Sequence, residues 1–231
     1  MKNQEQFNQI VKVVQEKASL KQQIYRNTAD TFSLFKSCAE SLVKKLELEM
    51  DTFDKDVAIE FIPKGDFEFQ LKIGGDILLF YMHTNVFDFH QTHPIKKTSY
   101  VKDDSMRSYC GLINIYNFLA DSFKYSRYAD SGYLIGRAFI NKDKHFFMEG
   151  KRQLNFLYND FMNDTVTKEH VHTIIQQAIL YAMDFDLYTP PYRHVQEISV
   201  GHLLQEASGM RLKTAKRLGF RFSSDEEGPQ F

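Results

Sequence analysis

The chain has 231 residues, of which 43% are apolar and 26% charged, and 29 Lys and Arg stand against 30 Asp and Glu. This composition is that of a globular protein, and it excludes intrinsically disordered and collagen-like chains. The net charge of −1 argues against a protein that coats nucleic acid non-specifically, since such proteins are strongly basic. The length predicts one large domain, or one domain with an added arm.

Residues 1–50 are predicted to form a long helix, because 3–50 contain no Gly or Pro and apolar residues recur at steps of three and four. Lys21 and Thr28 interrupt this stripe, which comprises Phe7, Val11, Val14, Ala18, Tyr25, Phe32, Phe35, Ala39, Leu42 and Leu46. A helix of about 45 residues would be ~68 Å long, longer than a compact domain of this size. Either the helix breaks near 21–28 and both halves pack in one core, or part of it protrudes. The repeat predicts a homo-oligomer, or a protein partner, bound through residues 7–46.

After residue 51 the apolar period changes to two, over 57–62, 67–73 and 77–83, with Gly-containing turns between the runs. Further strand-like runs follow at 109–119, 132–140 and 145–148. An amphipathic helix beginning near 168 and a short helix at about 199–207 are expected to cover one face of the resulting sheet. The predicted fold class is therefore α+β, with an antiparallel sheet of five or six strands, a long N-terminal helix and C-terminal helices packed on it. We expect a core domain at 51–209 and an arm at 210–231.

The chain shows no sign of secretion or membrane insertion. It begins without an apolar signal-like run, and its densest apolar run, 77–82, is far shorter than the ~20 residues of a membrane span. Two cysteines, Cys38 and Cys110, are too few for a disulfide framework or a four-cysteine zinc site. We therefore expect a soluble cytoplasmic protein without membrane contact.

No established catalytic or nucleotide-binding motif is present, and no cofactor is predicted. The long segment 85–107 is expected to be a functional loop, a lid or a packed irregular segment. Imidazole and carboxylate ligands suit zinc or iron, and the candidate metal ligands near this segment are His83, Asp88, His90 and His93. The alternative is a polar loop whose histidines hydrogen-bond the backbone.

Two weaker catalytic hypotheses concern strands. Cys110 would need a nearby base and a lowered pKa to act as a nucleophile, and a cysteine in a strand is more often a packing residue. Asp66, Glu68 and Lys72 resemble the carboxylates and lysine of metal-dependent nucleases, but Gln70 stands where that pattern has its lysine. Alternating polar residues on an exposed face explain them equally well.

Arg137 lies inside an otherwise apolar strand, and its charge requires water, a carboxylate or an anionic ligand. Together with Lys151 and Arg152 it forms a candidate anion-binding site. The alternative is an ion pair with Glu149 across neighbouring strands.

A basic stretch at 210–222 is followed by acids at 225–227. Its five cations, with no acid among them, are Arg211, Lys213, Lys216, Arg217 and Arg221. Cations interleaved with Phe suit phosphates and bases, so nucleic acid binding through 211–221 is one hypothesis. The other is a solvated arm balanced by the acidic tail.

These observations favour a non-enzymatic interaction module that self-associates and recognises a protein or a small anionic ligand. A nucleic-acid- or ribosome-associated factor is the second hypothesis, and a metal-dependent enzyme using the histidine loop is the third.

Overall fold

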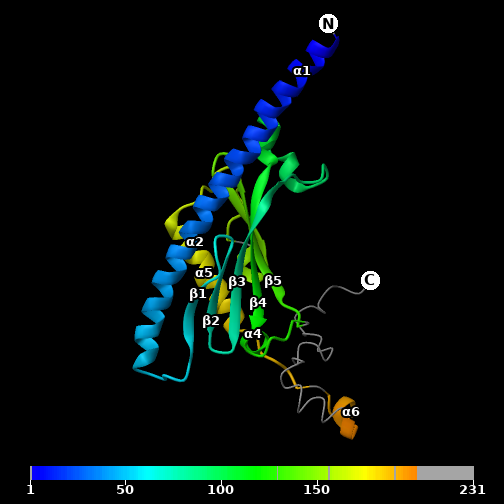
Figure 1. Ribbon diagram of the computed structural model, residues 1–231. Helices are drawn as coiled ribbons and strands as arrows, with labels where there is room; N and C mark the ends of the chain where they lie inside the picture. Colours follow the sequence, from blue (N-terminus) through cyan, green and yellow to red (C-terminus); the bar gives the residue numbers. More distant parts are fainter. Residues whose placement is uncertain (1, 129, 156, 190, 202–231) are drawn as a thin grey trace.

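The computed structural model describes residues 2–128, 130–155, 157–189 and 191–201. The predicted basic arm at 210–222 and most of the short helix expected at 199–207 lie outside these ranges. The described part has an α+β architecture, in which a long N-terminal helix and a C-terminal helix pack on an antiparallel sheet (Figure 1). The predicted fold class is thereby confirmed.

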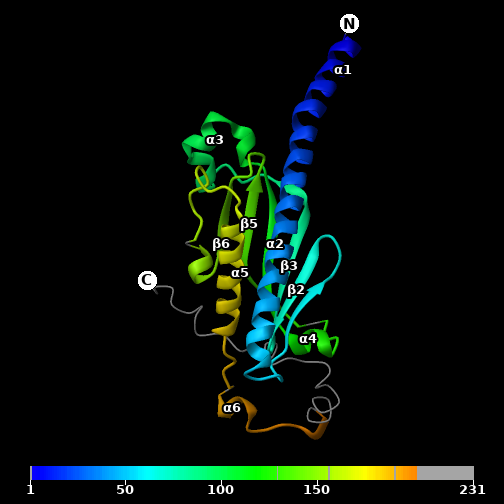
Figure 2. The ribbon, with the colours of Figure 1, turned by 90° about the vertical axis from the view of Figure 1, so that its left-hand side faces the viewer.

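The N-terminal helix is continuous over three consecutive segments, which are α1 (Lys2–Val13), the π-helical η1 (Val14–Ala18) and α2 (Ser19–Asp51). The prediction of a break near 21–28 is wrong, and the alternative of a protruding helix is correct. Figures 1 and 2 show α1 extending beyond the end of the sheet, while α2 lies along the sheet.

Thr28, which interrupts the apolar stripe, lies where the helix packs directly against the backbone of Gly111 in the sheet. Its side chain is fully buried, and its hydroxyl donates to the Ile24 carbonyl at 2.7 Å. A Cβ on Gly111 of the sheet would lie 1.9 Å from the Thr28 Oγ1, so Gly111 is the residue that allows this contact. The hydroxyl is therefore satisfied within the helix and does not end it.

Six strands form one meander in the order β1-β2-β3-β4-β5-β6, with every neighbouring pair antiparallel. They are β1 (Ile59–Pro63), β2 (Glu68–Ile73), β3 (Asp76–Phe87), β4 (Cys110–Leu119), β5 (Tyr133–Asn141) and β6 (Phe146–Gly150). The turns between the first three strands contain Gly65 and Gly74, both at positive φ, where glycine is favoured. The short helix α4 (Ala120–Lys124) follows β4.

The main core lies between the sheet and two helices, α2 and α5 (Lys168–Met183). Phe32 and Phe35 of α2 pack against Phe69 and Phe80 of the sheet, whose rings stack at 4.6 Å between centroids. Thr167 caps α5, since its hydroxyl accepts from the His170 amide. The buried residues of α2, which run from Leu20 to Val43, thus pack in the core of a single chain.

The segment after β3 packs against the opposite face of the sheet as an irregular chain of short helices. These are η2 (Pro94–Lys97), α3 (Ser99–Asp103) and η3 (Ser105–Ser108). With Phe139, Phe147 and Phe161 they enclose a second, smaller core that includes Ile95 and Tyr100. Of the three expectations for 85–107, the packed irregular segment agrees with the structure.

The two edges of the sheet differ. Beside β6, the Phe146 amide donates to Asp164 and the Met148 amide to Tyr158, so a loop covers that edge. The edge strand β1 has no described strand on its outer side. The chain then leaves α5 and passes through α6 (Tyr192–Val195), whose residues are all exposed. Among the described residues, no helix is long and apolar enough to cross a membrane.

Candidate functional site

The projecting helix carries an uncovered apolar stripe. Every residue from 3 to 19 is exposed except Val11, which is half-buried. Phe7, Ile10 and Val14 are 58%, 60% and 55% exposed, and with Val11 they are spaced by three and four, which places them on one side of the helix. Lys17, near the end of this stretch, lies with its Nζ 5.7 Å from the centre of the ring of Tyr109, the residue just before β4.

A polar row crosses the sheet on the face opposite to α2 and α5. Direct cross-strand partners share a face, and the register joins Glu68, Tyr81, Asn114, Arg137 and Glu149 in one line across five strands. The row begins at Glu68 in β2, the strand next to β1, and ends at Glu149 in β6, beside the second core. It is the part of this face that carries the predicted anion-binding residue Arg137.

Arg137 is paired within the chain. Its Nε donates to the Glu149 Oε2 at 2.7 Å, its Nη2 lies 2.6 Å from the same oxygen, and its guanidinium lies over the Phe139 ring. The predicted pairing with Glu149 is therefore confirmed, although 41% of the arginine side chain stays exposed. A ligand role for Arg137 stays a prediction, and a ligand there would have to compete with Glu149.

His93 also contacts the Arg137 and Glu149 pair, through Glu149, and the sequence analysis did not predict this contact. Its Nδ1 accepts from the Ile95 amide at the start of η2, and its Nε2 lies 3.5 Å from the other oxygen of Glu149. Its ring packs on Phe89 at 4.5 Å between centroids. Glu149 thus links the segment 88–109 to β5, and no local pattern in the sequence indicates that contact.

The other predicted metal ligands have separate partners. The His83 Nδ1 accepts from the Asn85 amide, and the His90 Nδ1 contacts the Thr92 hydroxyl. Asp88 is bound by Lys96 at 2.6 Å and by Ser108 at 2.7 Å. Within the described ranges, no three His, Cys, Asp or Glu side chains are placed to hold a metal ion. The structure therefore does not bring the four residues together as a site.

The Asp88 carboxylate accepts several hydrogen bonds within the segment 88–109. Burial raises the pKa of its carboxyl, but hydrogen bonds from Lys96, Ser108 and the Phe89 amide outweigh burial and hold the pKa below its usual value. The Lys96 side chain is only 11% exposed. These contacts join residues within the segment 88–109, and all of them end on the same oxygen, Asp88 Oδ1.

The other candidate anion-binding residues do not converge on Arg137. Arg152, which has a positive φ in η4 (Arg152–Asn155), pairs with Asp184 and lies over the Tyr181 ring. The Lys151 amide donates to the Ile135 carbonyl, and its side chain is exposed. Arg211, Lys213, Lys216, Arg217 and Arg221 lie outside the described residues.

Neither cysteine has the environment of a nucleophile. Cys110 is fully buried, and desolvation raises the pKa of its thiol, as it does for Cys38. The suggested carboxylate pattern on β2 is also differently arranged. Glu68 accepts from Gln70, while Lys72 reaches across to Glu60 on β1.

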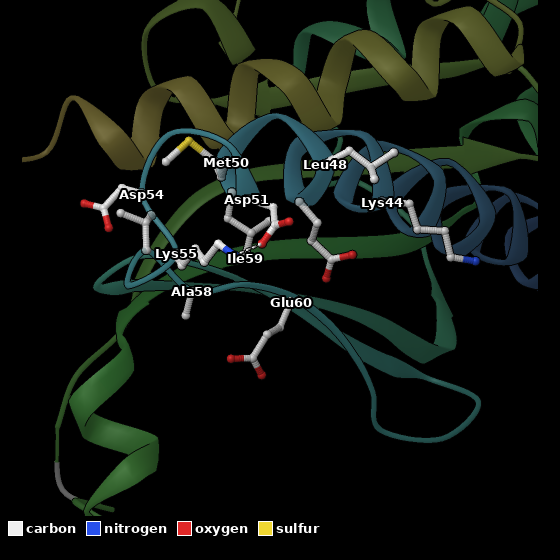
Figure 3. A pocket seen from close by; sticks show the side chains of 11 residues that line it. Lys44, Leu48, Met50, Asp51, Asp54, Lys55, Ala58, Ile59 and Glu60 are labelled. Atoms are coloured by element: carbon white, nitrogen blue, oxygen red, sulfur yellow. Dashed lines mark ion pairs between the residues drawn. The ribbon is translucent and has the colours of Figure 1, made fainter.

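A groove opens where α2 ends beside β1. It has a volume of about 660 Å³ and is lined by the last turns of α2, the linker and the start of β1 (Figure 3). Lys44, Leu48 and Asp51 come from the helix, Asp54 from the linker and Glu60 from the strand. Sequence reasoning missed this groove, although the acids concentrated at 47–60 are visible in the sequence.

No known protein family matches the chain, and neither curated proteins nor solved structures include one that is significantly similar to it.

Proposed function

We propose that the protein is a cytoplasmic interaction module that self-associates through α1. The observation that carries this proposal is the apolar stripe Phe7, Ile10, Val11 and Val14, exposed on a helix that lies beyond the sheet. Two copies would pair these stripes side by side and bury the same residues on both chains, as a two-fold interface does. Two buried free cysteines suit a reducing compartment.

The energetics support pairing. Fully burying a large apolar side chain is worth about 1.5–3 kcal/mol, and each copy offers four. The segment contains several Asn, Ile and Val residues, which are weaker helix formers than Ala or Leu, and it gains little from packing on its own chain. A second copy of α1 supplies the missing contacts, whereas the apolar residues of α2 between Leu20 and Val43 already pack within the chain.

The test is light scattering across a range of protein concentrations. The wild-type chain is expected to be dimeric at micromolar concentration, and Phe7→Glu with Ile10→Glu is expected to be monomeric. Losing ~3 kcal/mol or more from two buried side chains corresponds to at least about 100-fold in the dissociation constant.

The matched control is Gln9→Glu with Lys12→Gln, which changes the net charge equally on the other side of the helix. It should remain dimeric, and circular dichroism should show both variants folded, since all four residues are exposed. A wild-type chain that stays monomeric at roughly 100 µM would refute the proposal, because even a weak specific dimer forms at that concentration. A dimer that survives Phe7→Glu with Ile10→Glu would place the interface elsewhere.

A further inference from the structure

Among the described residues, no strand pairs with the outer edge of β1, and the first residues of this strand line the groove. The Gly74 amide donates to the Ala58 carbonyl at 2.7 Å, and the Lys64 amide donates to the Glu68 carbonyl at 3.2 Å. Because hydrogen-bonded pairs alternate in an antiparallel ladder, the intervening even residues, Glu60 and Ile62, bond to β2. Ile59 and Phe61 therefore direct their N–H and C=O groups outward, where another strand can pair with them.

The same region carries a concentrated negative charge. Residues 47–60 contain six acids and one lysine, a net charge of −5; the acids are Glu47, Glu49, Asp51, Asp54, Asp56 and Glu60. Asp51 lies 3.6 Å from Lys55, and Glu60 pairs with Lys72. The last turn of α2 contains no basic residue, although the carbonyl end of a helix favours cations. The groove lining itself holds four of these acids and two lysines, a net charge of −2, and it therefore favours a basic occupant.

The chain itself contains a segment of matching charge. Residues 210–222 have five cations and no acid, a net charge of +5. In an extended conformation Arg211, Lys213 and Arg217 share one face, while Leu212 and Leu218 share the other. The groove offers apolar surface as well, since Leu48 is 73% exposed and Val57 36%.

The chain leaves the described residues at the end of the molecule that holds the groove. Figures 1 and 2 show residues 184–201 at the end of the molecule where α2 also stops, and in Figure 1 they lie on the other side of the strands from the end of α2. Eight residues separate 201 from 210, and an extended stretch of that length spans about 30 Å.

We propose that residues 210–222 dock in this groove in the same chain, adding a strand to the outer edge of β1. The added strand bonds to the backbone of Ile59 and Phe61 and sets its basic face against the acids of 47–60. Because the contacts between charges are exposed, salt weakens the docking, while the backbone bonds fix its register. This proposal is independent of self-association through α1.

Amide hydrogen exchange, measured residue by residue on the full chain, tests the docking. In the wild-type chain the Ile59 and Phe61 amides should be protected, as are those of Glu60 and Ile62. In Lys213→Glu with Arg217→Glu, exchange at Ile59 and Phe61 should rise about tenfold or more, while Glu60 and Ile62 stay protected. The matched control, Lys97→Glu with Lys102→Glu, reverses two exposed charges far from the groove and should behave as wild type.

Three outcomes would overturn the proposal. The first is rapid exchange at Ile59 and Phe61 in the wild-type chain at low ionic strength. The second is protection that disappears on dilution, which would assign the arm in the groove to a second copy. The third is RNA retention through 210–222 without protection of the two amides, which would assign the arm to nucleic acid. Repeating the exchange measurement on the chain with Phe7→Glu and Ile10→Glu shows whether protection of the two amides depends on self-association through α1.

Discussion

Replacing Gly111 by alanine should destabilise the protein, because β4 and α2 touch there without room for a side chain. The added Cβ would lie 1.9 Å from the Thr28 Oγ1 and 2.8 Å from the Thr28 Cβ. Rotating the Thr28 side chain relieves the first overlap but leaves the second. Overpacking costs about 1–3 kcal/mol, and the overlap between two Cβ atoms places this case at the upper end. The lower entropy of the unfolded alanine chain offsets ~0.5–1 kcal/mol.

We therefore expect Gly111→Ala to lower the free energy of unfolding by about 2 kcal/mol, measured by urea denaturation followed by circular dichroism. Thr28→Ala removes the overlapping hydroxyl and methyl groups, so the two substitutions together should cost less than their sum by ~1 kcal/mol. The matched control is Gly136→Ala in β5, where the nearest atom, the Leu154 Cδ1, lies 3.3 Å away at the end of a flexible side chain. An effect of Gly111→Ala no larger than that of Gly136→Ala would refute the reasoning.

Two further predictions concern buried polar and thiol groups. Cys38 and Cys110 should react with a thiol reagent only after denaturation, and rapid labelling of native protein would show that one of them is accessible. Lys96→Met should cost ~1–3 kcal/mol at pH 7, because it leaves the Asp88 carboxylate without its ammonium partner. Since the pKa of Asp88 is lower in the folded than in the unfolded chain, its ionised form contributes stability above pH ~4. This contribution is lost as the pH falls below ~4 and through the lowered pKa of the folded carboxyl. The difference between wild type and Lys96→Met should therefore narrow at low pH, and a constant difference in urea denaturation would contradict this account.

The fold was predictable where the sequence pattern was local. Phe67, Phe69, Leu71 and Ile73 alternate with polar residues, and they lie on the helix-covered side of β2 or at its start. The helix was harder, because Thr28 looks like an interruption until Gly111 is known to lie against it. That contact joins residues far apart in the sequence, and no periodicity within the helix indicates it.

In the candidate site, too, the contacts between neighbouring strands were predictable from the sequence, while those between distant segments were not. The Arg137 and Glu149 pair followed from strand neighbours with a short turn between them, and the register places them directly opposite each other. His93 reaches Glu149 only because the segment 88–109, which the Asp88 and Lys96 pair holds together internally, folds back over the sheet. Such tertiary placement depends on packing of Ile95 and Tyr100 in the second core, which spacing alone does not specify.

The π-helical turn at Val14–Ala18 sets the direction in which the projecting helix faces. An α-helix turns by about 100° per residue, and a π-turn accommodates roughly one residue more than an α-turn. The side of α1 that carries Phe7 and Ile10 is therefore rotated relative to the side of α2 that packs on the sheet. A single inserted or deleted residue within this turn would leave both faces intact yet swing one around the helix axis. The orientation of two assembled chains would thus be encoded in the length of one turn, separately from the composition of either surface.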